Sequence, residues 1–130
     1  MNYESLFVNP NGRTSRGQFI GALIPLLAAA ALYGLVVKGI NGQWCLAMLL
    51  FPAMVLHARR LHDMGRTAWL LLAPGALDVA ALRLQMGGRG DQLESAVTLA
   101  ALAVSAGFAL WGVVGKGQAE ANRFGEPAAA

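Results

Sequence analysis

The sequence predicts an all-α integral membrane protein, a four-helix bundle with both termini in the cytoplasm. Composition is the first reason, because 56% of the 130 residues are hydrophobic and only 13% are charged, against roughly 45–50% and about 25% in soluble domains. Four apolar segments are the second reason, and the placement of basic residues at their ends is the third. A soluble domain of this size would leave large apolar patches in water, so a membrane accounts better for the composition.

The length predicts a single domain, and composition divides it into three parts. We expect a cytoplasmic N-terminal segment at residues 1–18, a transmembrane domain of four spans at 19–115, and a cytoplasmic tail at 116–130. Cys45 is the only cysteine, which excludes an internal disulfide and a metal site built from cysteines.

The first helix is expected to begin at about Ser15. Ser15 and Gln18 have the spacing of a capping box, in which the serine hydroxyl accepts from the Gln18 amide and the Gln18 side chain reaches back. From Phe19 to Val37 no residue is charged, and at about 1.5 Å per residue this run spans roughly 28 Å, close to the hydrocarbon thickness of a bilayer. Pro25 is expected to kink the helix.

The second apolar run extends from Trp44 to Ala58, and the polar residues on both sides can lengthen it into a span. Gly65 is a natural residue to follow the end of this helix, because glycine readily adopts the left-handed conformation found there. Thr67 is the expected N-cap of the next helix.

The third run, Ala68 to Leu84, is the least regular of the four. It contains Pro74, Gly75, Asp78 and Arg83. It is therefore either a kinked helix or one that re-enters the membrane from the same side. A glycine-rich loop is expected at residues 85–92, and a last helix from Leu93 to Val114.

Lysine and arginine are divided unevenly between the two ends of such a bundle. The end that carries both termini would hold Arg13, Arg16, Arg59, Arg60, Arg66, Lys116 and Arg123. The other end would hold Lys38, Arg83 and Arg89. Because cytoplasmic loops are enriched in lysine and arginine, this difference predicts that both termini lie in the cytoplasm.

Three motifs on the predicted cytoplasmic side resemble the signatures of one family. The N-terminal motif, similar to glycine-arginine-x-serine-arginine, is Gly12-Arg13-Thr14-Ser15-Arg16-Gly17-Gln18-Phe19. The central motif, similar to arginine-arginine-leucine-histidine-aspartate, is Arg59-Arg60-Leu61-His62-Asp63-Met64-Gly65-Arg66-Thr67-Ala68-Trp69. The C-terminal motif, similar to asparagine-x-aromatic-glycine, is Asn122-Arg123-Phe124-Gly125-Glu126-Pro127. The family is the small bacterial inner-membrane proteins catalogued as "domain of unknown function 805".

The resemblance covers nearly the whole chain and implies a bacterial inner-membrane protein with several helical spans. It implies no activity, because the biochemistry of the family is not established. Gln18 stands where the family usually has glutamate, so a role that rests on an N-terminal carboxylate does not carry over to this chain.

The arginines of the cytoplasmic side allow two interpretations. In one, they orient the protein, and Asp63 ties the central hairpin together by pairing with Arg59 or Arg66. In the other, they bind an anion, because guanidinium groups match phosphate with two hydrogen bonds and basic clusters at the membrane attract acidic lipid headgroups. The candidate residues for binding an anion or a lipid headgroup are Arg13, Arg16, Arg59, Arg60 and Arg66.

The polar residues of the motifs, to which we assign structural roles, are Ser15, Gln18, His62, Asp63 and Asn122. An enzyme that acts on headgroups through His62 and Asp63 is the weakest functional hypothesis. A metal site is not expected, because His57 and His62 are five residues apart rather than the three or four that place two ligands on one helix face.

Asp78 is the candidate functional residue inside the membrane. Counted from Trp69 it lies near mid-depth, where an ionisable residue costs at least ~2.5 kcal/mol on insertion scales and is a candidate for proton or cation movement. The alternative is that Asp78 pairs with Arg83, or lies nearer the outer interface because a Pro-Gly pair distorts the helix.

We therefore expect a small, non-enzymatic protein of the bacterial inner (cytoplasmic) membrane whose arginine-rich face binds anionic lipid headgroups or a partner. The alternative is a small transporter or proton-coupled channel that uses Asp78. Membrane lipids are the expected partners, and small-residue pairs such as Gly17 and Gly21 allow a homo-oligomer. No cofactor, metal or nucleic acid is expected.

Overall fold

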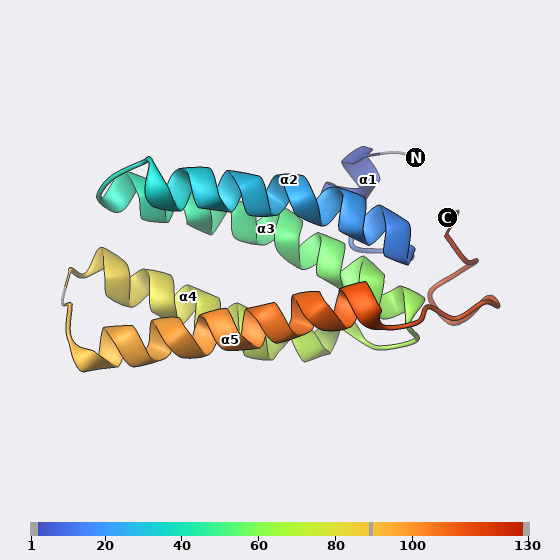
Figure 1. The fold of residues 1–130 in the computed structure, drawn as a ribbon. Helices are drawn as coiled ribbons and strands as arrows, with labels where there is room; N and C mark the ends of the chain where they lie inside the picture. Colours follow the sequence, from blue (N-terminus) through green and yellow to red (C-terminus); the bar gives the residue numbers. More distant parts are fainter. Residues whose placement is uncertain (1–2, 89, 129–130) are drawn as a thin grey trace.

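The structure, a computed structural model, describes residues 3–88 and 90–128. Its long helices are α2 (Arg16–Leu35), α3 (Ile40–Asp63), α4 (Leu72–Met86) and α5 (Gln92–Val114). A short helix, α1 (Tyr3–Val8), precedes them, and a 3-10 helix, η1 (Ala68–Leu71), leads into α4. The long helices run back and forth along one axis, and both ends of the described chain lie at the same end of the bundle (Figure 1).

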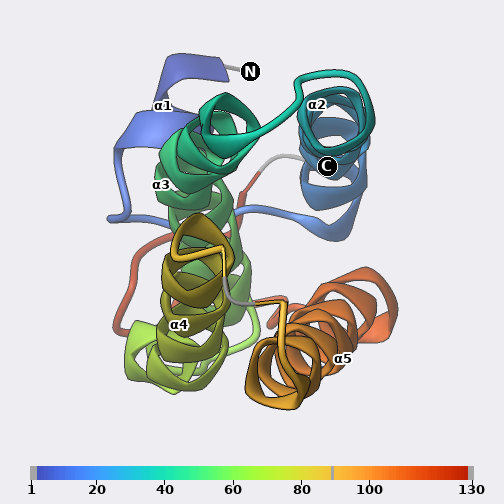
Figure 2. The same cartoon turned by 90° about the vertical axis from the view of Figure 1, so that its left-hand side faces the viewer.

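The bundle is built from two hairpins, α2 with α3 and α4 with α5. Figure 2 shows that α3 and α4 lie side by side, whereas α2 and α5 diverge toward the end remote from the termini. Near the termini the two hairpins close on each other, because the fully buried ring of Phe19 in α2 lies against Gly112 in α5. The described residues are thus all-helical, as the sequence predicts.

The lengths and surfaces of the helices suit a bilayer. Four helical segments are long and apolar enough to span a membrane, the third being η1 and α4 together. Large apolar side chains point outward along them, including Ile24, Leu32, Met48, Phe51 and Leu102. Soluble monomers rarely expose so many large apolar groups, so these faces suit contact with lipid.

The predicted start of α2 is confirmed. Ser15 is the N-cap, and the capping box is complete: Gln18 N donates to Ser15 Oγ at 3.3 Å, and Ser15 N donates to Gln18 Oε1 at 3.2 Å. The glutamine amide oxygen therefore performs the capping role at this position without a carboxylate.

The predicted end of α3 is also confirmed. Gly65 adopts a φ of 77° directly after the C-cap residue Met64, and Arg66 N donates to Leu61 O at 2.8 Å. This pattern is a Schellman motif, in which a left-handed residue turns the chain back over the last helical turn. Thr67 then caps η1, as expected, by accepting from Trp69 N.

Replacing Gly65 with alanine is expected to lower the free energy of unfolding by about 1–2 kcal/mol, because a Cβ penalises the left-handed conformation. The added atom would also meet the Gln118 side chain. Gly107→Ala is the matched control, because the position is helical with open space around it, and alanine favours a helix over glycine. Denaturant titration in detergent measures both, and equal stability of the two variants would contradict the assignment of Gly65.

The third span is a 3-10 turn followed by an α-helix that runs beside α5 to the opposite end of the bundle (Figure 1). Of the two alternatives, the structure favours a helix that runs the length of the bundle over a re-entrant segment. Pro74 is the third residue of α4, where an N–H has no helical carbonyl to bond, so proline starts the helix and does not break it.

The helix α1 is an element that the sequence did not predict, because residues 1–18 were interpreted as polar and turn-rich. Leu6 is 2% exposed and packs in a core cluster with Phe19, Ala22 and Leu56. The apolar run of residues 6–8 was the available signal. Of the expected basic residues, Arg89 lies outside the part of the chain that the structure describes.

Candidate functional site

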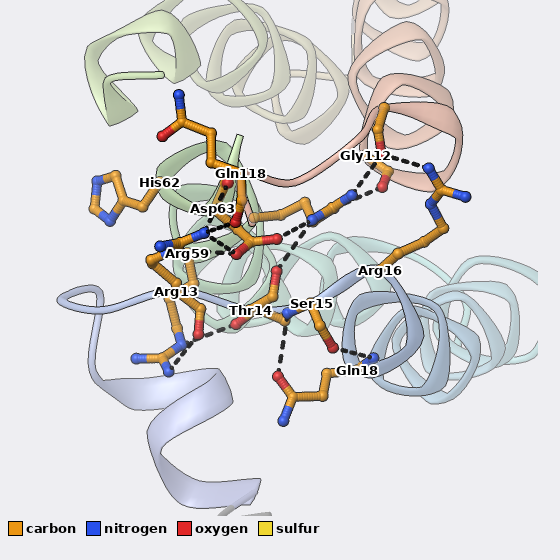
Figure 3. A network of polar contacts seen from close by, with 12 residues as sticks. Arg13, Thr14, Ser15, Arg16, Gln18, Arg59, His62, Asp63, Gly112 and Gln118 are labelled. Atoms are coloured by element: carbon orange, nitrogen blue, oxygen red, sulfur yellow. Dashed lines mark hydrogen bonds and ion pairs between the residues drawn. The ribbon is translucent and has the colours of Figure 1, made fainter. Parts of the chain in front are cut away.

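Asp63, the last residue of α3, is the centre of a buried ionic cluster (Figure 3). Its Oδ2 lies 2.6 Å from the Arg60 guanidinium, one turn earlier, and its Oδ1 lies 2.9 Å from the guanidinium of Arg13. Arg13, Arg60 and Asp63 are 3%, 1% and 5% exposed. Burial strengthens these pairings and makes the loss of any partner costly.

Arg13 also joins the C-terminal tail to the bundle. Its guanidinium donates to the backbone oxygens of Glu120 at 2.8 Å and Gly125 at 3.2 Å, and to that of Gln118. Gln118 N donates in turn to Asp63 O at 2.7 Å. One planar group with five donors can serve all these acceptors, which an ammonium group cannot.

Arg60 joins α3 to the end of α5. Its Nε donates to Gly112 O at 2.8 Å, and one terminal nitrogen donates to Gly115 O at 2.6 Å. The last carbonyls of a helix lack helical partners and carry partial negative charge, so a guanidinium is well suited to them. Arg60 also reaches Thr14 O at 3.3 Å.

Arg59 holds the segment between α1 and α2. Its Nε donates to the Thr14 hydroxyl at 3.0 Å, and its terminal nitrogens donate to the backbone oxygens of Asn9 and Arg13, each at 3.1 Å, and Asn11. Thr14 N donates back to Arg59 O at 3.1 Å. We call Arg13, Arg59, Arg60 and Asp63 the arginine clamp.

The clamp corrects two expectations. Asp63 pairs with Arg13 and Arg60, not with Arg59 or Arg66, because Arg59 extends toward the N-terminal segment and Arg66 lies beyond the chain reversal at residue 65. The five candidate arginines also do not all face outward to bind an anion, because Arg13 and Arg60 are buried and four of the five donate to acceptors of the protein itself.

Two of the five candidate arginines remain exposed. Arg16, the first residue of α2, donates to Gly115 O at 3.0 Å and to Val114 O at 3.3 Å from an exposed position. Arg66 stands over the ring of Trp111, with 6.0 Å between its guanidinium carbon and the ring centroid. Lys116 and Arg123 are exposed in the tail that follows α5, and this tail lies at the end of the bundle that carries both termini (Figure 1).

His62 contacts residues of the other two motifs, and Asn122 contacts His62. The His62 ring stacks on Phe124, with centroids 4.0 Å apart, and its Nδ1 lies 3.0 Å from Gly12 O. Asn122 Nδ2 donates to His62 O at 3.0 Å. Among the described residues, no group of three or more His, Cys, Asp and Glu could hold a metal ion.

The three sequence motifs therefore meet in one place, although the residues that Arg13 joins are up to 112 positions apart. A family model described as "Protein of unknown function (DUF805)" matches residues 7–126. The chain belongs to the DUF805 family. No curated protein and no solved structure matches it. The match extends from α1 to the tail, so the whole arginine clamp of this DUF805 protein lies within it.

Sequence reasoning missed the backbone that surrounds the clamp in this DUF805 protein. At Gly117 an added Cβ would overlap Asp63 Oδ2. Thr14 is fully buried and accepts from both Arg59 and Arg60. The glycine pair at residues 115 and 117 was the available signal, since closely spaced glycines permit a close approach of backbone to a side chain.

Asp78 lies in α4 and accepts from the Ser105 hydroxyl of α5, at 2.8 and 3.1 Å from its two oxygens. The alternative in which Asp78 pairs with Arg83 is not formed, because five helical positions turn the two side chains roughly 140° apart. Arg83 is exposed, and no ion pair of Asp78 is formed within the described part of the chain.

Proposed function

We propose that this DUF805 protein is a non-enzymatic protein of the bacterial inner membrane whose cytoplasmic face binds anionic lipid headgroups. The observation that carries the proposal is the exposure of Arg16 and Arg66 beside the arginine clamp. Exposed guanidinium groups at a membrane surface attract acidic headgroups and match phosphate with paired hydrogen bonds.

The orientation follows from the distribution of charge. The end of the bundle with both termini carries the clamp and the exposed Arg16, Arg66, Lys116 and Arg123, whereas Lys38 and Arg83 are the described cations of the opposite end. Cytoplasmic loops are enriched in lysine and arginine. This asymmetry supports a cytoplasmic position for both termini.

The clamp supports binding in two ways. It has three guanidinium groups and one carboxylate, so it adds a net positive field to the face beneath which it lies. It also fixes the ends of α2, α3 and α5 against one another, and Arg16 stands on the first of these helices. Side chains on rigid elements lose less conformational freedom when they bind a ligand.

The test is selective retention of phosphatidylglycerol over phosphatidylcholine by the full-length protein, measured by native mass spectrometry after purification from mixed nanodiscs. The double variant Arg16→Gln with Arg66→Gln is expected to weaken retention roughly thirtyfold, because each cation at the surface contributes about 1 kcal/mol. High salt is expected to reduce wild-type retention in the same direction.

Arg83→Gln is the matched control, because it removes an exposed arginine from the opposite end of the bundle. We expect this variant to retain phosphatidylglycerol as the wild type does. If the double variant and the control retained phosphatidylglycerol equally, the proposal would be contradicted. The exposed arginines would then be candidates for binding a protein partner.

A further inference from the structure

A cleft of about 420 Å³ lies between the two helix hairpins, in the membrane-spanning part of the bundle. Leucines and alanines of α2, α3, α4 and α5 form most of its wall. Its wall includes residues of α2 and α5, the two helices that diverge in the end-on view of Figure 2. Its volume is within the roughly 300–1,000 Å³ of pockets that bind small molecules.

Asp78 places an acid in this apolar wall. The Ser105 hydroxyl is its hydrogen-bond donor, and a hydroxyl has one hydrogen to give. Within residues 3–88 and 90–128 no arginine, lysine or histidine forms an ion pair with it, whereas Asp63 pairs with two guanidinium groups. Asp78 thus keeps acceptor capacity that this part of the chain does not use.

The other polar side chains of the cleft have partners. Of the lining residues, Gln85 accepts from Gln43 Nε2, outside the cleft, at 3.2 Å and donates through its own Nε2 to Thr98 Oγ1 at 3.0 Å. His57 Nδ1 lies 2.7 Å from a backbone oxygen of its own helix. Asp78 is therefore the acidic side chain of the cleft, and Gln85, Thr98 and His57, which also line it, each have a hydrogen-bond partner.

A carboxylate in hydrocarbon surroundings is costly unless it is protonated or paired with a cation, so a cation is the ligand that would stabilise its charged form. Ca²⁺ and Mg²⁺ take six or more oxygen ligands, and leucine and alanine side chains supply none. An organic cation needs one carboxylate for its charge and an apolar surface for its body. Leu27 and Leu102 line the cleft and are 58% and 63% exposed, so the opening faces sideways, toward the lipid.

We propose that the cleft binds a lipophilic organic cation, with the charge beside Asp78 and Ser105 and the apolar body against the leucines of the hairpins. The ligand enters from the membrane between α2 and α5. This site lies elsewhere in the fold than the headgroup-binding face, and its ligand has the opposite charge. The two proposals are therefore independent of each other.

The test uses the full-length protein in nanodiscs of zwitterionic phosphatidylcholine, with tetraphenylphosphonium as the probe and equilibrium dialysis as the measurement. Saturable binding is expected for the wild type. Asp78→Asn is expected to weaken it about tenfold or more, because a contact to a charged group is lost. Ser105→Ala is expected to have a smaller effect in the same direction. A neutral triphenyl probe, triphenylphosphine oxide, is expected to bind equally to the wild type and Asp78→Asn.

Glu126→Gln is the matched control, because it removes an exposed carboxylate of the tail that does not line the cleft, and it is expected to bind tetraphenylphosphonium as the wild type does. Uptake that does not saturate, or that is equal in Asp78→Asn, would overturn the proposal and indicate a cleft filled by lipid chains. If Asp78→Asn does not fold, Ala106→Trp replaces it, because this side chain lines the cleft and the acid remains. If Ala106→Trp bound tetraphenylphosphonium with wild-type affinity, the proposal would likewise be overturned.

Discussion

Asp63→Asn is expected to lower the free energy of unfolding by roughly 3–5 kcal/mol, the cost of removing one partner from a buried ion pair. The variant would leave Arg13 and Arg60, which are 3% and 1% exposed, without a counter-charge. The neutral amide offers one acceptor oxygen where the carboxylate offers two. Unfolding by titration with a denaturing detergent in mixed micelles measures the change.

Glu126→Gln is the control for the loss of one carboxylate, because Glu126 is exposed in the tail. We expect the control to stay within about 0.5 kcal/mol of the wild type. If Asp63→Asn lowered the free energy of unfolding by less than about 1 kcal/mol, the carbonyl partners alone would hold Arg13 and Arg60. Hydrogen bonds rather than ion pairs would then stabilise the clamp.

Arg60→Lys is expected to lower the free energy of unfolding by roughly 2–4 kcal/mol although the charge is kept, since several hydrogen bonds from a charged donor are lost. The guanidinium serves acceptors on three sides: Asp63, the end of α5, and the N-terminal segment before α2. A lysine ammonium concentrates its donors at one point and cannot reach all of them.

The same substitution at Arg66 is the matched control, because this arginine is exposed and its described contact is with the Trp111 ring. Detergent titration is again the measurement, and Arg66→Lys is expected to stay within about 0.5 kcal/mol of the wild type. If both substitutions lowered the free energy of unfolding equally, the planar geometry of the Arg60 guanidinium would not contribute to stability.

The helical class, the apolar spans and several helix ends follow from the amino-acid sequence. These features depend on short-range physics: the capping box needs Ser15 and Gln18 three residues apart, and the Schellman turn needs a glycine at residue 65. The apolar spans can be predicted from hydropathy alone, because an apolar run of this length suits the hydrocarbon of a bilayer whichever helices pack beside it.

The partners of the polar side chains could not be predicted, because they depend on how the helices pack. The pairing of Asp63 with Arg13 rather than Arg59 joins residues 50 positions apart, and local spacing holds no information about such a contact. The pairing of Asp78 with Ser105, and the cleft around them, depend on how the two hairpins pack. Helix periodicity gives the face of a side chain but not the neighbour opposite it, and that neighbour is set by packing over the whole bundle.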